Sequence, residues 1–238
     1  MLILAIDSAT SVAGVALLNG EKLLKEEFSN YKKTHSETLM VMVDRVLKEC
    51  ECTIQQVDAF AVTIGPGSFT GLRIGLAAVK GLSLATGKPV AGVSTLDTLA
   101  HNLCGSDALI CPLLDARRQE VYCGFYDVTG AIPYKLHENL ACSPAEFAVK
   151  ARDVAVKKGK DRIILLGDGY YPYAEFFQQE LGNCLQIPPP HLMLPRAAAL
   201  GSLGLKKAQQ GEFEDILSLR PVYIRLSEAE YRLGRGEL

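Results

Sequence analysis

The first hundred residues switch repeatedly between a strand-like and a helix-like spacing of apolar side chains. Continuous apolar runs at residues 2–7 and 57–64 are typical of buried strands, and a shorter run at 88–94 predicts another. The run at 12–28 is divided by an Asn-Gly dipeptide, which favours a two-stranded hairpin. Together with the helices described next, the order is βββαβα followed by a further βα, which indicates a mixed sheet covered by helices.

Helical spacing appears in three segments between these strands. Residues 34–51 repeat apolar side chains with helical period, and Thr34 followed by Glu37 predicts a capping box at the start. A long helix is expected from about residue 69 to residue 86, and a shorter one over 96–103. Each predicted helix therefore follows a predicted strand.

From about residue 106 the pattern of the first half begins again. Residues 108–130 repeat the layout of residues 2–20: an apolar strand ending in Asp, a polar turn, a second strand and a Gly turn. Such self-similarity predicts an internal duplication whose second copy has drifted. We therefore expect an α/β protein of two units, 1–105 and 106–238, the second one reduced.

Composition and charge exclude some classes of protein. A net charge of −2 gives no overall electrostatic attraction to nucleic acid, so RNA binding would need a local patch or another subunit. The first residues, MLILAIDS, form an apolar run too short for a signal peptide or membrane anchor. Seven scattered cysteines, an odd number, are typical of reduced and mostly buried thiols, so we expect a cytoplasmic protein.

The most distinctive stretch is IGPGSFTGLRIG, residues 64–75, which leads into the long helix. A glycine-rich turn at a helix N-terminus can bind an anion, but it can also serve packing alone. Ser68 is the expected N-cap. Glycines inside the helix each cost about 1 kcal/mol relative to alanine, which indicates close approach of another backbone. We therefore expect a packing helix, with anion binding secondary.

Apolar surface on this helix and on the preceding one exceeds what one core normally uses. The long helix is apolar nearly all round, and the preceding helix is rich in Met, which suits adaptable interfaces. We expect a two-helix docking face, with the alternative that both faces are filled within the first unit. The residues predicted for this face are Leu39, Met42, Val43, Val46, Gly71, Gly75, Leu76 and Val79.

Several stretches together resemble a known family. A strand ending in Asp with a Ser/Thr turn, in duplicated βββαβα halves, resembles the actin-like ATPase superfamily, which has an RNase H-like fold. The stretches ILAIDSAT, HSETL, TIGPGSFTGLRIGLAAVKGLSLATGKPVAGVSTLDTLA, LLDARRQEVYCGFY and RPVYIR are more specific. They resemble the TsaB family, also called YeaZ, over the whole chain.

The resemblance implies a role in tRNA modification. TsaB-like proteins are paralogues of the TsaD enzymes, which transfer threonylcarbamoyl to the adenosine beside the anticodon of tRNAs reading A-starting codons. The implied partners are a TsaD-like enzyme in a heterodimer and a TsaE-like ATPase, with tRNA reached indirectly through the complex. Without the enzyme, the two-helix face predicts a homodimer. No cofactor and no membrane contact are expected.

Catalysis by this chain itself lacks its main support. TsaD-like enzymes carry a metal site with a motif resembling V-N-H-x-x-x-H, whereas this chain has Thr95 and Leu99 at the two histidine places. Threonine is a poor replacement for imidazole, and leucine cannot ligate a metal. His101 lies two positions from Leu99 on another helix face. We expect no metal site and a pseudoenzyme without catalytic residues.

Nucleotide binding is also weakened relative to actin-like ATPases, whose first Asp is typically followed by Gly and Thr. The weak nucleotide candidates that remain are Asp7, Ser8 and Thr10, with a second turn at Gly167, Asp168 and Gly169. The alternative interpretation is that both turns only end strands. If it is an enzyme after all, the chain would be an ATP-dependent small-molecule kinase or a glycoprotease-type metallopeptidase.

Two arginines complete the candidate residues. The family pattern places Arg117 and Arg118 at the first hairpin of the second half. We expect them to face the cleft between the two units and to contact a partner or tRNA; the alternative is a solvated turn.

Overall fold

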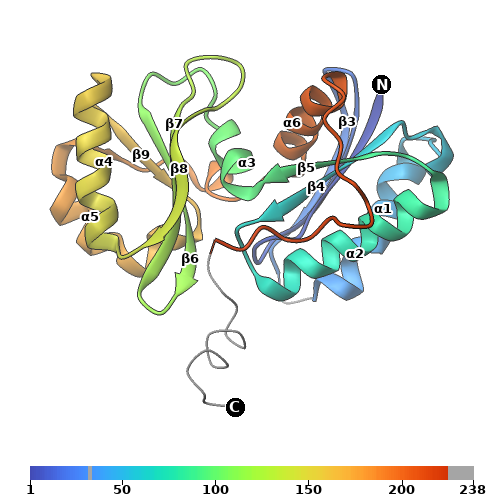
Figure 1. Ribbon diagram of the computed structural model, residues 1–238, viewed down its shortest axis with the longest axis horizontal. Coiled ribbons are helices and arrows are strands. Elements are labelled where there is room, and N and C mark those ends of the chain that lie inside the picture. The colour runs from blue at the N-terminus through green and yellow to red at the C-terminus, as the bar shows by residue number, and fades with distance from the viewer. Residues whose placement is uncertain (32–33, 225–238) are drawn as a thin grey trace, which may run out of the picture.

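A computed structural model describes residues 1–31 and 34–224 of the chain. It contains two five-stranded mixed sheets, each with its own helices, standing side by side with a gap between them (Figure 1). The first sheet is formed by β1 (Leu2–Asp7), β2 (Ala13–Asn19), β3 (Lys22–Ser29), β4 (Ala59–Gly65) and β5 (Val90–Ser94). The second is formed by β6 (Leu109–Arg117), β7 (Glu120–Asp127), β8 (Tyr134–Cys142), β9 (Ile163–Leu166) and β10 (Leu185–Gln186).

The two sheets have the same topology. The strand order is β3-β2-β1-β4-β5 in the first and β8-β7-β6-β9-β10 in the second. In both, the first three strands pair antiparallel and the next two pair parallel. The predicted duplication and the α/β fold of the actin-like type are thereby confirmed.

Six α-helices and four short 3-10 helices connect the described strands. The α-helices are α1 (His35–Glu49), α2 (Phe69–Thr86), α3 (Thr95–His101), α4 (Pro144–Lys158), α5 (Ala174–Leu181) and α6 (Ala197–Gln209). The 3-10 helices are η1 (Ile54–Gln56), η2 (Asp168–Tyr173), η3 (Gly182–Cys184) and η4 (Pro190–Leu192).

Local sequence signals set several of these boundaries. Helix α1 begins with the predicted capping box, in which the Glu37 carboxylate accepts from the Thr34 amide and hydroxyl. Helix α2 spans the predicted residues, and the Ser68 hydroxyl oxygen accepts from the Gly71 amide at 3.2 Å. All seven cysteines are free thiols, although Cys184 is exposed.

The last helix does not follow the predicted division of the chain. Residues 106–238 were expected to form one unit, but α6 returns to the first sheet, where Ala197 and Leu200 pack with Ile3 and Ala5 (Figure 1). Polar contacts at the start of α6 hold it there. The Glu26 carboxylate on β3 accepts a hydrogen bond from the Ala198 amide at 3.0 Å. The same carboxylate forms an ion pair with Arg196.

The first sheet is therefore covered on both faces. Helices α1 and α2 form one core with residues of β1, β2 and β4, while α6 covers the opposite face. Helix α3 packs into the core of the second sheet through Leu96, Leu99 and Ala100. Because α3 directly follows β5 of the first sheet and packs against the second, it links the two units.

Candidate functional site

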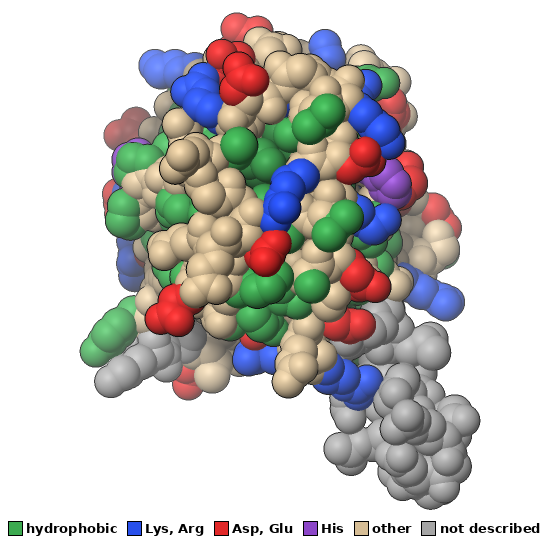
Figure 2. Space-filling model, turned by 90° about the vertical axis from the view of Figure 1, so that its left-hand side faces the viewer, with side chains coloured by type: hydrophobic (Ala, Val, Ile, Leu, Met, Phe, Trp, Pro, Cys, Tyr) green, Lys and Arg blue, Asp and Glu red, His purple; other side chains and the backbone are tan. Residues whose placement is uncertain are grey.

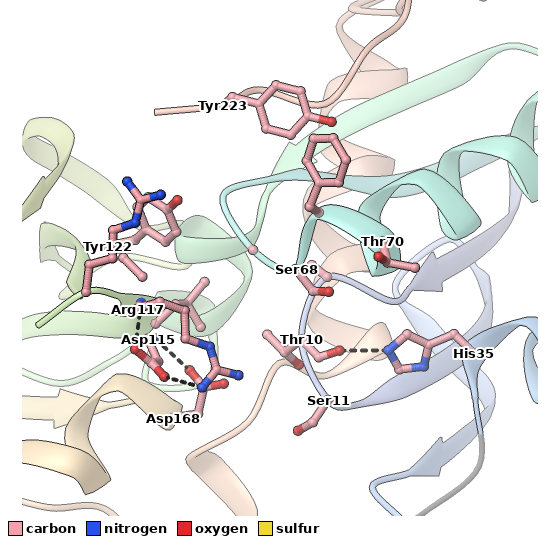
Figure 3. A pocket seen from close by; sticks show the side chains of 16 residues that line it. Thr10, Ser11, His35, Ser68, Thr70, Asp115, Arg117, Tyr122, Asp168 and Tyr223 are labelled. Carbon is pink, nitrogen blue, oxygen red and sulfur yellow. Dashed lines mark hydrogen bonds and ion pairs between the residues drawn. The ribbon is translucent and has the colours of Figure 1, made fainter. Parts of the chain in front are cut away.

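A cleft of about 800 Å³ lies between the two sheets. Its first wall comes from the β1–β2 turn and the start of α2, and the opposite wall comes from the β6–β7 hairpin (Figure 3). The residues that line it are Ala9, Thr10, Ser11, His35, Gly67, Ser68, Phe69, Thr70, Leu114, Asp115, Ala116, Arg117, Arg118, Tyr122, Asp168 and Tyr223.

Asp7, the predicted nucleotide aspartate, lies beneath the cleft and not in its lining. The side chain is fully buried, and its Oδ1 accepts hydrogen bonds from the Thr63 hydroxyl at 2.6 Å and the Ala9 amide at 3.1 Å. Burial raises the pKa of the Asp7 carboxyl, although these hydrogen bonds oppose the shift. Asp7 is thus a structural group that fixes the β1–β2 turn.

Ser8 is likewise occupied within the chain. Its hydroxyl donates to the Gly71 carbonyl oxygen at 2.8 Å, and the side chain is 1% exposed. A Cβ at Gly71 would lie 2.1 Å from the Ser8 carbonyl oxygen, and a Cβ at Gly75 would lie 2.4 Å from the Ser8 hydroxyl oxygen. The glycines of α2 therefore admit the β1–β2 turn of the same chain.

The glycine loop before α2 packs against the same turn. A Cβ at Gly67 would lie 2.2 Å from the Ala9 carbonyl oxygen, and the Ser68 amide donates to that oxygen at 2.7 Å. Of the first-turn candidates, only Thr10 reaches the cleft. Its carbonyl oxygen accepts from His35 Nε2 at 2.7 Å, which leaves His35 Nδ1 buried and without a partner among the described residues.

The second candidate turn is held against β6. Gly167 has φ of 107°, and a Cβ there would lie 2.0 Å from the Leu113 carbonyl oxygen. A Cβ at Gly169 would lie 2.7 Å from the Leu114 carbonyl carbon. Close backbone packing explains both glycines. Asp168 between them does line the cleft; burial raises its pKa, and the hydrogen bond from the Asp115 amide opposes the shift.

The β6–β7 hairpin brings both predicted arginines into the cleft lining. Arg117, Arg118 and Gln119 all have positive φ, between 52° and 60°, which is uncommon for residues other than glycine. Arg117 Nη1 pairs with Asp115 Oδ2 at 3.1 Å, while 86% of the Arg117 side chain stays exposed. Non-glycine residues held in this region of backbone conformation cluster at functional sites.

Comparison with known proteins decides the family. The family model described as TsaD, tRNA N6-adenosine threonylcarbamoyltransferase, matches residues 22–233. The tRNA threonylcarbamoyladenosine biosynthesis protein TsaB of Bacillus subtilis is 34% identical over 231 residues, which cover 97% of this chain and 96% of that protein. The chain belongs to the TsaB family.

Solved structures agree with this assignment. A Pseudomonas aeruginosa protein described as similar to peptidase YEAZ is 30% identical, with a TM-score of 0.80 over 94% of this chain and 99% of that one. Component A of the Acidaminococcus fermentans (R)-2-hydroxyglutaryl-CoA dehydratase shares the fold alone, at 11% identity and a TM-score of 0.52; the match covers 88% of this chain and 99% of that one. The chain is thus a TsaB-family protein with a role in tRNA threonylcarbamoyladenosine biosynthesis.

Three aromatic residues of this TsaB-family cleft were not among the predicted site residues. Phe69 stacks on Tyr223 with ring centroids 5.3 Å apart, and the Arg73 guanidinium lies 3.7 Å from the Phe69 ring. Tyr122 lies on the opposite wall (Figure 3). Tyr223 lies in the family-like stretch RPVYIR, but its place in the cleft was not predicted, because the C-terminal segment returns to the first unit only after α6.

All eight residues predicted for the partner interface are instead buried within the chain. Each of the six larger side chains is at most 4% exposed and belongs to the core beneath α1 and α2, and Gly71 and Gly75 face Ser8. The predicted close approach of another backbone occurs at Gly71, where that backbone is the chain's own first turn. Gly75 meets the Ser8 side chain, and a Cβ on Gly81 would meet no atom within 4 Å. As a docking face, these eight positions are wrong.

The residues at the family's metal position are also core residues. Thr95 and Leu99 are fully buried, and the Thr95 hydroxyl has no hydrogen-bond partner among the described residues. Within 1–31 and 34–224, no group of three His, Cys, Asp or Glu side chains is placed to hold a metal ion. No helix in the described part of the chain is long and apolar enough to span a membrane.

The outer face of the second unit carries a mixed surface. Figure 2 looks onto the side that holds α4 and α5, where basic, acidic and apolar side chains are interspersed. On this face, Arg152 pairs with Glu180 at 2.5 Å and Lys157 pairs with Asp153 at 2.7 Å. These pairs neutralise local charge, so this face does not present the basic stripe that is typical of RNA-binding surfaces.

Proposed function

We propose that this chain is a non-catalytic subunit that binds and activates a TsaD-type enzyme. The complex would threonylcarbamoylate the adenosine beside the anticodon of tRNAs reading A-starting codons, in the cytoplasm. A TsaE-like ATPase would join the same complex, and tRNA would be held mainly by the other subunits. The family assignment supports the pathway, and the chemistry of the cleft supports the non-catalytic role.

The observation that carries the non-catalytic role is the occupation of both phosphate turns by the chain itself. In the first turn, the Ala9 amide donates to Asp7, and the Ser68 amide donates to the Ala9 carbonyl. At the second candidate turn, Gly167 and Gly169 pack against the backbone of Leu113 and Leu114, and the Asp115 amide donates to Asp168 Oδ1 at 3.1 Å. Backbone amides spent in this way are not available to a polyphosphate, which disfavours the kinase alternative. Thr95 and Leu99 disfavour the metallopeptidase alternative.

The docking surface in this proposal is the outer face of α1 and α2. Met40 and Val41 on α1 are 45% and 53% exposed, and Leu84 on α2 is 66% exposed. Between them, Ala77 and Gly81 are exposed, and a Cβ on Gly81 would meet no atom within 4 Å. Small residues flanked by apolar ones let a partner helix approach closely.

The same face would pair with a second copy when the enzyme is absent. A twofold axis beside α2 would bring Gly81 of one chain near Gly81 of the other, because an isologous contact uses one patch twice. Homodimer and heterodimer would then compete. TsaD-type enzymes would offer a similar pair of helices, since the family model that matches this chain is theirs.

The experiment that tests the proposal is a reconstituted tRNA modification assay. Purified chain, purified TsaD-type enzyme and both together are supplied with TsaE-like ATPase, threonylcarbamoyl adenylate and tRNA. Only the mixture should modify tRNA efficiently, and the chain alone should show no transfer. Transfer by the isolated chain, or full activity of the enzyme without it, would refute the proposed role.

A further inference from the structure

The cleft has an aromatic ring on each wall, and one of them, Tyr223, is held in place by contacts with the first unit. Tyr223 is backed by Phe69, with an angle of 28° between the rings, and its hydroxyl accepts from Arg73 Nε at 3.3 Å. The backbone before it is fixed, because the Val222 amide donates to the Ile64 carbonyl at 2.7 Å. Tyr223 stays 39% exposed and lines the cleft. Figure 3 shows it across the cleft from Tyr122.

The positive charge in the cleft is concentrated on one hairpin. Arg117, Arg118 and Tyr122 all line the second wall of the cleft. Asp115 engages one end of the Arg117 guanidinium, whose five N–H donors and 86% exposure leave donors directed to solvent. The Asp168 carboxylate is engaged within the chain, because its Oδ1 accepts from the Asp115 amide at 3.1 Å. The hairpin can therefore attract an anion.

The kind of anion is limited by the backbone. The amides of Ala9, Ser68 and Arg117 are engaged with Asp7, Ala9 and Asp115 and are not available to a polyphosphate. Among the side chains of the cleft, arginine suits a single phosphate because its guanidinium can donate two parallel hydrogen bonds. A ligand that suits this cleft carries a planar ring for the tyrosines and one phosphate for the arginines. A single nucleotide has both groups.

We propose that the cleft binds one unstacked nucleotide, with its base between Tyr122 and Tyr223 and its phosphate on Arg117 and Arg118. Bases stack on aromatic side chains, and proteins recognise RNA mostly at unpaired loops whose bases can be splayed out. Naming an RNA loop as the source rests on the proposed function. A free nucleoside monophosphate offers the same chemistry, so the two sources must be told apart.

The test is fluorescence anisotropy of a labelled RNA hairpin with an unpaired loop, titrated with the full-length chain. Tyr223→Leu should weaken binding about 5- to 150-fold, the range that stacking of one base supports. Arg117→Ala should also weaken it and reduce its salt dependence, whereas Tyr223→Phe should retain it. Tyr134→Leu and Arg45→Ala are matched controls outside the cleft, and both should bind as wild type does.

Competition separates the two sources. If AMP displaces the hairpin, and if Tyr223→Leu weakens AMP binding, the cleft takes free nucleotides. If the loop RNA binds and AMP does not, the nucleotide that the cleft binds belongs to an RNA chain. The proposal is overturned if neither binds, if a fully paired duplex binds equally well, or if Tyr223→Leu and Arg117→Ala bind as wild type does.

The subunit role can fail separately. Complex formation with the TsaD-type enzyme is measured on the same variants. A normal complex with no nucleotide binding at the cleft refutes this inference alone. Cleft binding without any complex would refute the proposed function alone. If Tyr223→Leu and Arg117→Ala weaken the enzyme complex and leave RNA binding unchanged, the cleft holds protein and the inference is wrong.

Discussion

The first hairpin turns of the two units occupy equivalent places in the duplicated fold but have opposite structures. In the first unit, Ser8 and its neighbours are buried under α2, and the glycines of that helix make room for them. In the second unit, Arg117, Arg118 and Gln119 have left-handed backbone conformations, and the two arginines line the cleft. Topology has been kept in both copies, while the chemistry of the turn has not.

This difference shows how two copies of one topology can form the opposite walls of a cleft with different turns. The first turn is committed to packing, because the nearest atom to a Cβ at Gly67, Gly71 or Gly75 belongs to Ser8 or Ala9. At the second turn, Gly167 and Gly169 beside η2 pack against β6, while Arg117 and Arg118 remain exposed and line the cleft. One wall of the cleft is therefore fixed by internal packing, and the other carries exposed arginines.

The largest effect is expected from filling the space at the first turn. Gly71→Ala places a Cβ 2.1 Å from the Ser8 carbonyl oxygen, and the backbone there cannot easily move. We expect the free energy of unfolding to fall by about 3 kcal/mol, the upper end of the usual cost of overpacking. Urea denaturation followed by circular dichroism measures it.

Gly81→Ala is the matched control on the same helix. Its Cβ would meet no atom within 4 Å, so the intrinsic helix preference of alanine should raise stability by about 1 kcal/mol. Equal effects of the two substitutions would show that the first turn is not the close contact described here.

A smaller effect is expected at the second turn. Gln119→Gly relieves a left-handed backbone conformation that costs a residue with a Cβ about 1–2 kcal/mol. Part of that gain is lost to the greater freedom of glycine in the unfolded chain, so we expect a rise in stability of about 1 kcal/mol. Thermal unfolding at a fixed scan rate measures it.

The reciprocal substitution is Gly20→Ala in the β2–β3 turn, where φ is 56° and no atom lies near the added Cβ. It should lower stability by a similar amount. If Gln119→Gly is neutral or destabilising, the β6–β7 hairpin is not strained.

Much of the fold could be predicted from periodicity and capping signals. The bounds of α2, the capping box of α1 and the duplication were all readable because they depend on local spacing. The return of α6 to the first sheet was not readable, because it depends on Glu26 and on packing between residues far apart in sequence. Apolar spacing in a sequence does not by itself distinguish residues of an apolar core from residues of an apolar interface.

The candidate site illustrates the same limit. Arg117 and Arg118 were placed correctly at the cleft, because strand order fixes where the hairpin lies. The eight interface positions were wrong, because helical spacing shows which residues share a face but not what covers it. Tyr223 belongs to the family-like stretch RPVYIR, but its place in the cleft could not be predicted, because it depends on the path of the chain after α6 and on the stack with Phe69.

The central claim is that the inner face of α2 stabilises the fold by packing against the first turn, and that its outer face binds the partner. Sedimentation velocity tests it most directly, with wild type, Gly81→Leu and the control Val156→Leu on α4, each with and without the TsaD-type enzyme. Circular dichroism first confirms that all three are folded. Gly81→Leu should weaken the homodimer and the heterodimer at least about tenfold, which is about 1.4 kcal/mol each, and Val156→Leu should change neither. If folded Gly81→Leu assembles as tightly as wild type does, the outer face of α2 is not the docking surface and the claim is wrong.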